Sequence, residues 1–500
     1  MIQHTDTTLR PDCSRVLVRP YIPLEQDRVE HIISRALTLT ECETEEQIAF
    51  LTAGFGNRHP DIRVIWQRHF EKVKHHVTHK RELSEVRKLY IGALFSGEYA
   101  LESAALFNPS IVPHPDQSGL EEGDLRCVIS LRAIGEEHIS SIEFRSAIIH
   151  RDASISIDVP AKFVSTPELN PDSLFFKTTF VHKLKEMGFD NPWATQVLTP
   201  LKETFTRQEL QRAMELASKG RRPRSREIER TVECVLWLAA SNYEIHFDPA
   251  ISLSERIIFP VSANEIHGME DARFVRFVDD DGSVTYYATY TAYNGTVVLP
   301  QLLMTKDFLN FRISTLNGSA IHNKGMAIFP RRIKGRYAIL SRHDEENLFL
   351  MYSDDPHFWS DPVLLQAPLM PWETVKIGNC GSPIETPSGW LVLTHGVGAM
   401  RRYCIGAMLL DLDDPSKVLG HFSEPLISPD DNEREGYVPN VVYTCGALIH
   451  NGRLILPYGV SDTATKIMTF ELEPLLTALL TSSPSAETRA LAHERKAAVI

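Results

Sequence analysis

The densest run of polar residues able to do acid–base chemistry is His267-Gly268-Met269-Glu270-Asp271-Ala272-Arg273, which leads directly into the apolar run FVRFV. An arginine two residues after a Glu-Asp pair can hold one carboxylate ionised and leave the other free to donate a proton. By itself the pattern is weak, because an acidic turn before a strand is usually only solvated. Asp271 is therefore a candidate general acid that needs support from the rest of the chain.

Three separate segments carry basic side chains beside strand-like runs. Arg342 follows YAIL, His395 ends a run of apolar residues, and Lys376 stands two residues before a glycine. The planar fork of an arginine, with a histidine and a lysine nearby, suits an anion. Arg312 is a further cation with a looser place in the pattern. Tyr293, in the segment 290–295, offers an aromatic face of the kind that packs against sugar rings, although such tyrosines are more often packing residues.

Motifs for metal and nucleotide chemistry are missing from the sequence. There is no HExxH pair, GxSxG elbow, Walker loop or dinucleotide fingerprint. The run His343-Asp344-Glu345-Glu346 is acidic, but adjacent residues rarely converge on one ion. We expect no metal and no organic cofactor.

Composition narrows the class of protein further. The 500 residues carry a formal charge of -13, which opposes nonspecific binding to nucleic acid. No stretch reaches the roughly 18 apolar residues that a membrane span needs, and the N-terminus lacks the pattern of a secretory signal. Seven scattered cysteines form no CxxC pair, which argues against a disulfide framework. We expect a cytoplasmic protein that binds neither membrane nor nucleic acid.

The periodicity of apolar residues changes along the chain. Residues 1–100 are predicted to be an N-terminal helical region, and residues 101–478 a β-domain with a helical insertion at about 173–240, followed by a tail over 479–500. Thr206 and Glu209 form a capping box in the insertion. Hairpin signals recur at Asp281-Gly282, Lys334-Gly335, Ser388-Gly389 and Asn451-Gly452. Many short antiparallel strands indicate a sandwich, a barrel or a propeller.

Taken in order, several motifs resemble those of glycoside hydrolase family 130, the β-mannoside phosphorylases and β-mannosidases built on a five-bladed β-propeller. The resemblance covers about residues 100–150 and 241–475. It rests on Asn108-Pro109, Leu131-Arg132-Ala133, Gly268 to Arg273, Tyr290 to Gly295, Lys324 to Pro330, Lys376-Ile377-Gly378, Gly389-Trp390-Leu391, His395-Gly396-Val397, Gly406 to Leu412 and Gly436 to Val442.

The resemblance implies roles for the matching residues. Asp271 would be the general acid, acting through a sugar hydroxyl rather than directly on the bridging oxygen. Phosphate would lie against Arg342, His395 and Lys376. The residues implied around the mannosyl unit are Asn108, Arg132, Glu270, Tyr293, Lys376 and Asp462.

The nucleophile decides between two enzyme classes. An inverting hydrolase needs a second carboxylate to deprotonate water, for which Glu385 and Glu435 are candidates, whereas phosphate is already anionic and needs cations. We expect a phosphorylase that cleaves β-1,2- or β-1,4-mannosides with inversion to α-mannose 1-phosphate. The hydrolase stays open because Ala272, Ser341 and the segment 379–382 depart from the family pattern. A non-catalytic glycan-binding propeller and self-association also stay open.

Overall fold

The computed structural model describes residues 2–59, 61–77, 82–219, 225–295 and 298–482. The chain divides into two compact units. The smaller unit comprises residues 12–103 and 161–165, and the larger unit comprises residues 1–11, 104–160 and 166–500. None of the helices in the described part of the chain is long and apolar enough to cross a membrane.

Apart from a short 3-10 turn, the described residues of the smaller unit form four α-helices and one two-stranded ribbon. Its elements are α1 (Gln26–Leu37), α2 (Glu41–Phe55), α3 (Ile62–Val73), α4 (Glu85–Leu94), β2 (Val16–Pro20) and β3 (Ser96–Ala100). Val29, Ile33 and Phe70 meet Ile91 in its core, because apolar residues three or four positions apart share one helix face. These helices lie within residues 1–100, where the sequence predicts a helical region.

In the larger unit, the described residues form five antiparallel sheets of four to six strands. The first sheet holds β4 (Ala105–Pro113), β5 (Leu125–Ile134), β6 (Ser140–Ile149), β7 (Ile155–Ile157) and β12 (Ile257–Ile258). The second holds β8 (Glu168–Leu169), β11 (Tyr243–His246), β13 (Met269–Val278), β14 (Val284–Tyr293), β15 (Val298–Thr305) and β16 (Asn310–Thr315).

The remaining three sheets follow in chain order. The third holds β17 (Ala327–Ile328), β18 (Tyr337–Ser341), β19 (Leu348–Ser353) and β20 (Val363–Gln366). The fourth holds β21 (Lys376–Asn379), β22 (Ile384–Thr386), β23 (Gly389–Val397), β24 (Tyr403–Leu410) and β25 (Val418–His421). The fifth holds β1 (Ile2–Leu9), β26 (Val442–Tyr443), β27 (Leu448–His450), β28 (Arg453–Val460) and β29 (Ala464–Glu471).

Apolar side chains between successive sheets make the core of the larger unit. Phe144 of the first sheet meets Phe274 of the second, Tyr287 of the second lies in one cluster with Ile339 of the third, and Leu340 of the third packs with Val392 of the fourth. The fourth and fifth sheets share a cluster, and so do the fifth and the first. Each sheet therefore packs on the next, and the last packs on the first.

The hairpin signals in the sequence mark turns between strands. Gly282, Gly335, Gly389 and Gly452 all have positive φ angles at these turns, which glycine adopts without strain. The main departure is β1, which was expected within a helical region but pairs with β29 as an edge strand of the fifth sheet. Its partner is more than 450 residues away, so no local pattern reveals the pairing.

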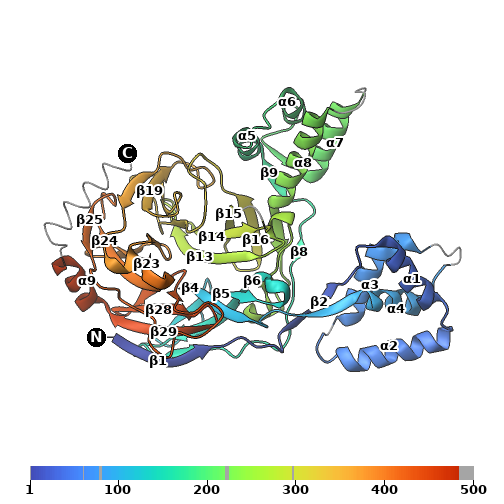
Figure 1. The fold of residues 1–500 in the computed structure, drawn as a ribbon, viewed down its shortest axis with the longest axis horizontal. Helices are drawn as coiled ribbons and strands as arrows, with labels where there is room; N and C mark the ends of the chain where they lie inside the picture. Colours follow the sequence, from blue (N-terminus) through green and yellow to red (C-terminus); the bar gives the residue numbers. More distant parts are fainter. Residues whose placement is uncertain (1, 60, 78–81, 220–224, 296–297, 483–500) are drawn as a thin grey trace. The chain divides into compact units, whose positions relative to one another are not determined.

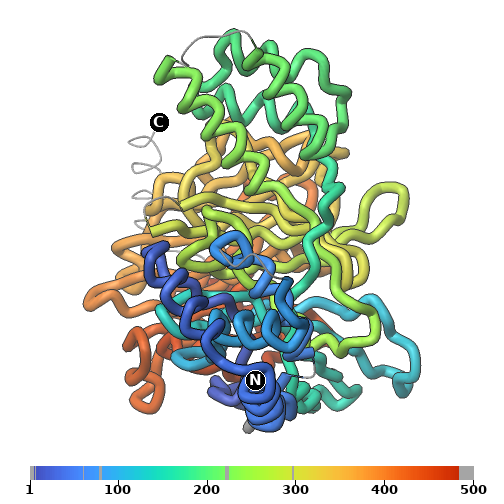
Figure 2. The backbone as a smooth tube through the Cα atoms, turned by 90° about the vertical axis from the view of Figure 1, so that its right-hand side faces the viewer, coloured from blue at the N-terminus to red at the C-terminus, as the bar shows by residue number. Residues whose placement is uncertain are grey.

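The described residues of the insertion form four helices, shown in green in Figures 1 and 2. They are α5 (Lys177–Glu186), α6 (Pro192–Leu198), α7 (Arg207–Ser218) and α8 (Arg226–Ser241), with a small ribbon of β9 (Leu174–Phe176) and β10 (Thr204–Thr206). The capping box of Thr206 and Glu209 is confirmed at the start of α7. Within the expected tail, residues 479–481 end α9 (Leu472–Thr481), and residues 483–500 lie outside the described part.

Candidate active site

Two irregularities in the sheets present the candidate acid and its neighbour. The register of β13 on β14 shifts between Glu270 and Arg273, and Asp271 in between has a φ of 56°. The register of β4 on β5 shifts in the same way around Asn108, whose φ is 48°. Bulges of this kind redirect side chains, and a positive φ is uncommon for residues other than glycine, although Asn and Asp adopt it more readily than most.

The redirected side chains converge on one cluster. The Asn108 amide donates to the Asp271 carboxylate at 2.7 Å. The Arg132 guanidinium reaches Asp271 at 3.4 Å and Glu270 at 2.9 Å, so it holds both carboxylates. Lys324 forms a second ion pair with Glu270. The structure therefore brings together Asn108, Arg132, Glu270 and Asp271, and it adds Lys324, which lay inside a quoted motif but was given no role.

The pKa of the Asp271 carboxyl is pulled in two directions. Burial raises it, but three nearby cations and the Asn108 amide outweigh burial and hold the pKa below its usual range. The cations are Arg132, Arg273 and Lys324. In the unliganded protein, Asp271 is therefore ionised near neutral pH.

Asp462 behaves in the opposite way. It occupies the turn between β28 and β29, with a φ of 49°, and interacts electrostatically with Arg132 and Asp271. Burial raises the pKa of Asp462 to about 7, and the negative charges of Asp271 and Glu270 act in the same direction, while Arg132 opposes them. The cluster thus combines Asp271, which is ionised near neutral pH, with Asp462, whose pKa lies close to neutral pH.

The raised pKa of Asp462 gives a testable dependence of stability on pH. A carboxyl whose pKa is higher in the folded state stabilises the fold at low pH, and this contribution is lost as pH rises from 3.8 toward about 7. In Asp462→Asn that loss is absent. We therefore compare the unfolding temperature of the variant with that of wild type at two pH values. The difference, variant minus wild type, should be more positive at about pH 8 than at about pH 5. Differential scanning fluorimetry at the two pH values measures this difference in unfolding temperature. The same difference at both pH values would contradict the raised pKa of Asp462.

Arg273 connects the acid to the neighbouring sheets. It is almost fully buried and donates to the Asp271 carbonyl at 2.9 Å, the Cys380 carbonyl at 2.7 Å and the Tyr443 hydroxyl at 2.8 Å. The Tyr443 ring packs edge-on against His395, with ring centroids 5.0 Å apart. Residues from the second, fourth and fifth sheets therefore meet in one network. The sequence pattern predicted only that Arg273 would hold a carboxylate ionised, which agrees with its charge lowering the pKa of Asp271, and it predicted no role for Tyr443.

Basic side chains gather at the far end of this network. The Arg342 guanidinium donates to Nε2 of His395 at 2.8 Å, and Lys376 lies over the Tyr403 ring at 5.5 Å. His395 also stacks on Tyr403, with ring centroids 6.2 Å apart. Burial lowers the pKa of His395 well below its usual value, and the charges of Arg342 and Lys376 lower it further, so the imidazole stays neutral. We call Arg342, Lys376 and His395 the cation cluster.

The cation cluster lacks a matching negative charge. Within the described residues, neither Arg342 nor Lys376 forms an ion pair with a carboxylate. Nε of Arg342 is buried and has no hydrogen-bond partner there. A buried guanidinium with an open donor is costly unless an anion binds it. Gly378 gives the cluster room, because a Cβ there would lie 2.7 Å from the His395 ring and 3.0 Å from Arg342.

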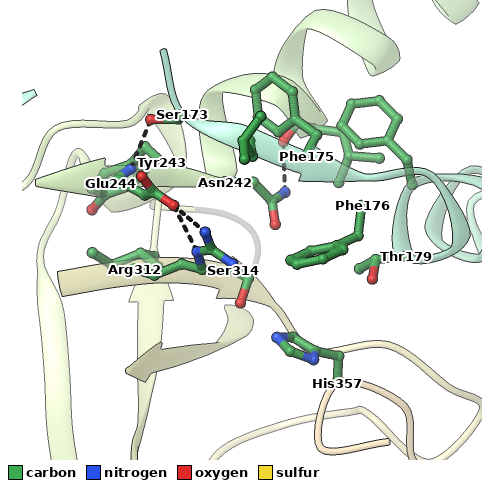
Figure 3. A pocket seen from close by; sticks show the side chains of 14 residues that line it. Ser173, Phe175, Phe176, Thr179, Asn242, Tyr243, Glu244, Arg312, Ser314 and His357 are labelled. Atoms are coloured by element: carbon green, nitrogen blue, oxygen red, sulfur yellow. Dashed lines mark hydrogen bonds and ion pairs between the residues drawn. The ribbon is translucent and has the colours of Figure 1, made fainter. Parts of the chain in front are cut away.

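Two of the candidate residues lie apart from this arrangement. Glu385 is held by Arg331 at 2.7 Å and lines a cavity with Arg276 and Val278, toward the end of β13 opposite to Asp271. Arg312 is paired with Glu244 in a different pocket, beside the helical insertion (Figure 3). Arg312, the looser candidate for a further cation, is therefore already paired with a carboxylate.

Tyr293 and Glu435 lie at the margins of the candidate active site. Tyr293 ends β14 and donates its hydroxyl to the Gly295 carbonyl at 2.9 Å, and no described contact joins it to Asp271. Glu435 is exposed and lies in a loop. The next residue, Gly436, packs against Ser461 and Thr463, which flank Asp462 in the chain. Of the two base candidates, Glu435 is the one whose loop packs beside Asp462.

Comparison with known proteins agrees with the motifs. The sequence profile of glycoside hydrolase family 130, described as beta-1,4-mannooligosaccharide phosphorylase, matches residues 227–480. The chain is 33% identical over 229 residues to 1,2-beta-oligomannan phosphorylase of Thermoanaerobacter sp. (strain X514), which covers 44% of this chain and 75% of that relative. The chain therefore belongs to glycoside hydrolase family 130, and it is an enzyme of that family.

Two further similarities were found. Beta-1,2-mannobiose phosphorylase of Listeria innocua is 34% identical over 214 residues, which is 41% of this chain and 59% of that relative. The solved structure of beta-1,2-mannobiose phosphorylase from Listeria innocua in complex with beta-1,2-mannobiose superposes with a TM-score of 0.45 at 21% identity, covering 76% of this chain and 93% of that chain.

Proposed function

We propose that this enzyme is an inverting β-mannoside phosphorylase, which uses inorganic phosphate to cleave β-1,2- or β-1,4-mannosidic bonds and releases α-mannose 1-phosphate. One observation carries the proposal. The cation cluster, whose Arg342 and Lys376 pair with no carboxylate in the part of the chain that the structure describes, is joined to Asp271 through Arg273 and Tyr443. The printed names of the relatives, which are phosphorylases of β-1,2- and β-1,4-linked mannosides, support the same substrate class.

The balance of charges favours phosphate over water as the nucleophile. An inverting hydrolase needs a base roughly 6.5 to 9.5 Å from its acid, whereas phosphate needs only positive groups. Glu385 is engaged by Arg331, while Arg342 and Lys376 have no carboxylate partner among the described residues. Glu435 remains the base for a hydrolytic alternative, since its loop borders Asp462.

The proposed reaction couples phosphate binding to protonation of the acid. The negative charge of a phosphate bound near Asp271 would disfavour the ionised carboxylate, so the pKa of Asp271 rises when phosphate is bound. Asp271 then gives its proton to a hydroxyl of the mannosyl unit, and that hydroxyl passes its own proton to the bridging oxygen. A phosphate oxygen forms the new bond to the anomeric carbon from the opposite face as the old carbon–oxygen bond breaks. No metal or organic cofactor takes part.

The five sheets fit the architecture that this chemistry requires. We infer that they are the blades of a five-bladed β-propeller, because each packs on the next in chain order and the fifth packs on the first. In a propeller, loops far apart in sequence meet around one central axis. This explains how residues from different sheets, such as Asp271 and Arg342, would face the same substrates.

Product analysis tests the proposal. The enzyme is incubated with β-1,2- and β-1,4-mannobiose, each with and without phosphate. We expect α-mannose 1-phosphate from at least one substrate, and no turnover when phosphate is omitted. Free mannose formed at the same rate in both conditions would establish the hydrolase instead, and binding without turnover would establish a glycan-binding protein.

A further inference from the structure

Glu265 is a completely buried carboxyl group, and the hydrogen-bond donors that the described residues offer to it are all neutral. It accepts hydrogen bonds from the hydroxyls of Tyr243 at 2.9 Å and Tyr290 at 2.6 Å, and from the backbone amides of Val261 at 3.1 Å and Ser262 at 3.0 Å. The exposed fraction of Glu265 is 0%. A buried carboxyl is stable only where such donors replace water. Four donors on one group therefore tie several segments to a single point.

The segment around Glu265 leads directly to the candidate acid. The Glu265 carbonyl accepts from the Gly268 amide at 2.6 Å, and the His267 amide donates to the Tyr293 carbonyl at 3.0 Å. Gly268 has a φ of 123°, and a Cβ there would lie 2.2 Å from Oγ of Ser140. The path from Glu265 to β13 is thus fixed on three sides. Asp271 follows three residues after Gly268, so its position depends on this path.

The Glu265 carboxyl also binds the chain where it leaves the helical insertion. Tyr243 is the first residue of β11 and comes two residues after α8 ends at Ser241. The Ser241 hydroxyl accepts from the Asn264 amide, next to Glu265. Asn242 lies between Ser241 and Tyr243 in the chain, and its side-chain oxygen accepts from the Thr315 backbone amide at 3.1 Å. Figure 3 shows Asn242 and Tyr243 where the insertion adjoins the second sheet.

We propose that Glu265 is a positioning residue, through which the C-terminal end of the insertion holds the segment 261–268 and thereby sets the position of Glu270 and Asp271. This assigns a task to the helical insertion. The catalytic consequence rests on the proposed function, whereas the mechanical consequence does not. Tyr243 gives the test, because its hydroxyl belongs to the insertion side of the contact.

The experiment compares Tyr243→Phe with Tyr286→Phe. Both tyrosines are buried in the second sheet and both changes remove one hydroxyl, but Tyr286 donates to the Pro113 carbonyl, away from Glu265. We expect Tyr243→Phe to lower kcat about tenfold, because a small displacement of a reacting group is costly. Its KM for phosphate should stay within about twofold, because the cation cluster is on other strands. Hydrogen exchange of residues 261–271 should be faster than in Tyr286→Phe.

The outcomes separate the inference from the proposed function. Equal hydrogen exchange and equal kcat in the two variants would overturn the inference, whatever the wild-type activity. If the wild-type enzyme shows no phosphorolysis but exchange over residues 261–271 rises only in Tyr243→Phe, the positioning is upheld and the phosphorylase is rejected. If Tyr243→Phe does not fold, Ser241→Ala removes the other contact between the end of the insertion and the segment 261–268, and it is judged in the same way.

Discussion

Asp271→Asn should lower the rate of mannoside phosphorolysis by about a thousandfold while the protein stays folded. Asparagine has nearly the same shape, and its carbonyl oxygen can still accept from Asn108 and Arg132, but it has no proton to give. Some thermal stability should be lost, because the carboxylate lies among Arg132, Arg273 and Lys324. Initial rates with mannobiose and saturating phosphate, together with circular dichroism, measure both effects.

Asp279→Asn is the matched control for this prediction. Asp279 follows the opposite end of β13 and pairs with Arg332, so the change also removes a carboxylate from an ion pair. Its turnover should stay within about twofold of wild type, since surface ion pairs contribute little. If Asp271→Asn keeps more than about a tenth of the wild-type rate, Asp271 is not the proton donor.

The second large effect is expected at Arg342. Arg342→Gln should raise the KM for phosphate about a hundredfold and change the KM for the mannoside much less, because removing one partner of a buried charged contact costs about 2 to 5 kcal/mol. Arg342 is 8% exposed, and Nε of its guanidinium has no hydrogen-bond partner among the described residues. Rates measured over a range of phosphate concentrations give both constants.

Arg312→Gln is the control at this position. Arg312 is bound by Glu244 beside the insertion, so phosphate kinetics should not change. A variant of Arg342 with an unaltered phosphate KM would show that the cation cluster does not bind the nucleophile. A large effect at Arg312 would likewise contradict the assignment.

The sequence predicted those parts of the structure that depend on local pattern. The hairpin turns and the capping box of Thr206 lie where the turn residues and the Thr–Glu spacing placed them, because both are set within a few residues. The grouping of Asn108, Arg132 and Asp271 was reached through motifs. It could not follow from periodicity, since these residues are joined only by tertiary contacts.

The parts that were missed depend on partners far away in the chain. Tyr443 joins Arg273 across 170 residues, and β1 joins the fifth sheet across an even longer separation. Arg312 has the right chemistry for phosphate, yet Glu244 on the adjacent strand neutralises it. The availability of a charge is a property of its surroundings, and a residue type alone does not reveal them.

The central claim is that phosphate binds beside Asp271, against the cation cluster. A crystal structure of Asp271→Asn with β-1,2-mannobiose and phosphate tests it most directly, because that variant should bind both substrates without turnover. We expect phosphate in contact with Arg342 and Lys376 and facing the anomeric carbon, with residue 271 on the mannosyl side. Phosphate bound elsewhere, or mannobiose bound away from residue 271, would contradict the account.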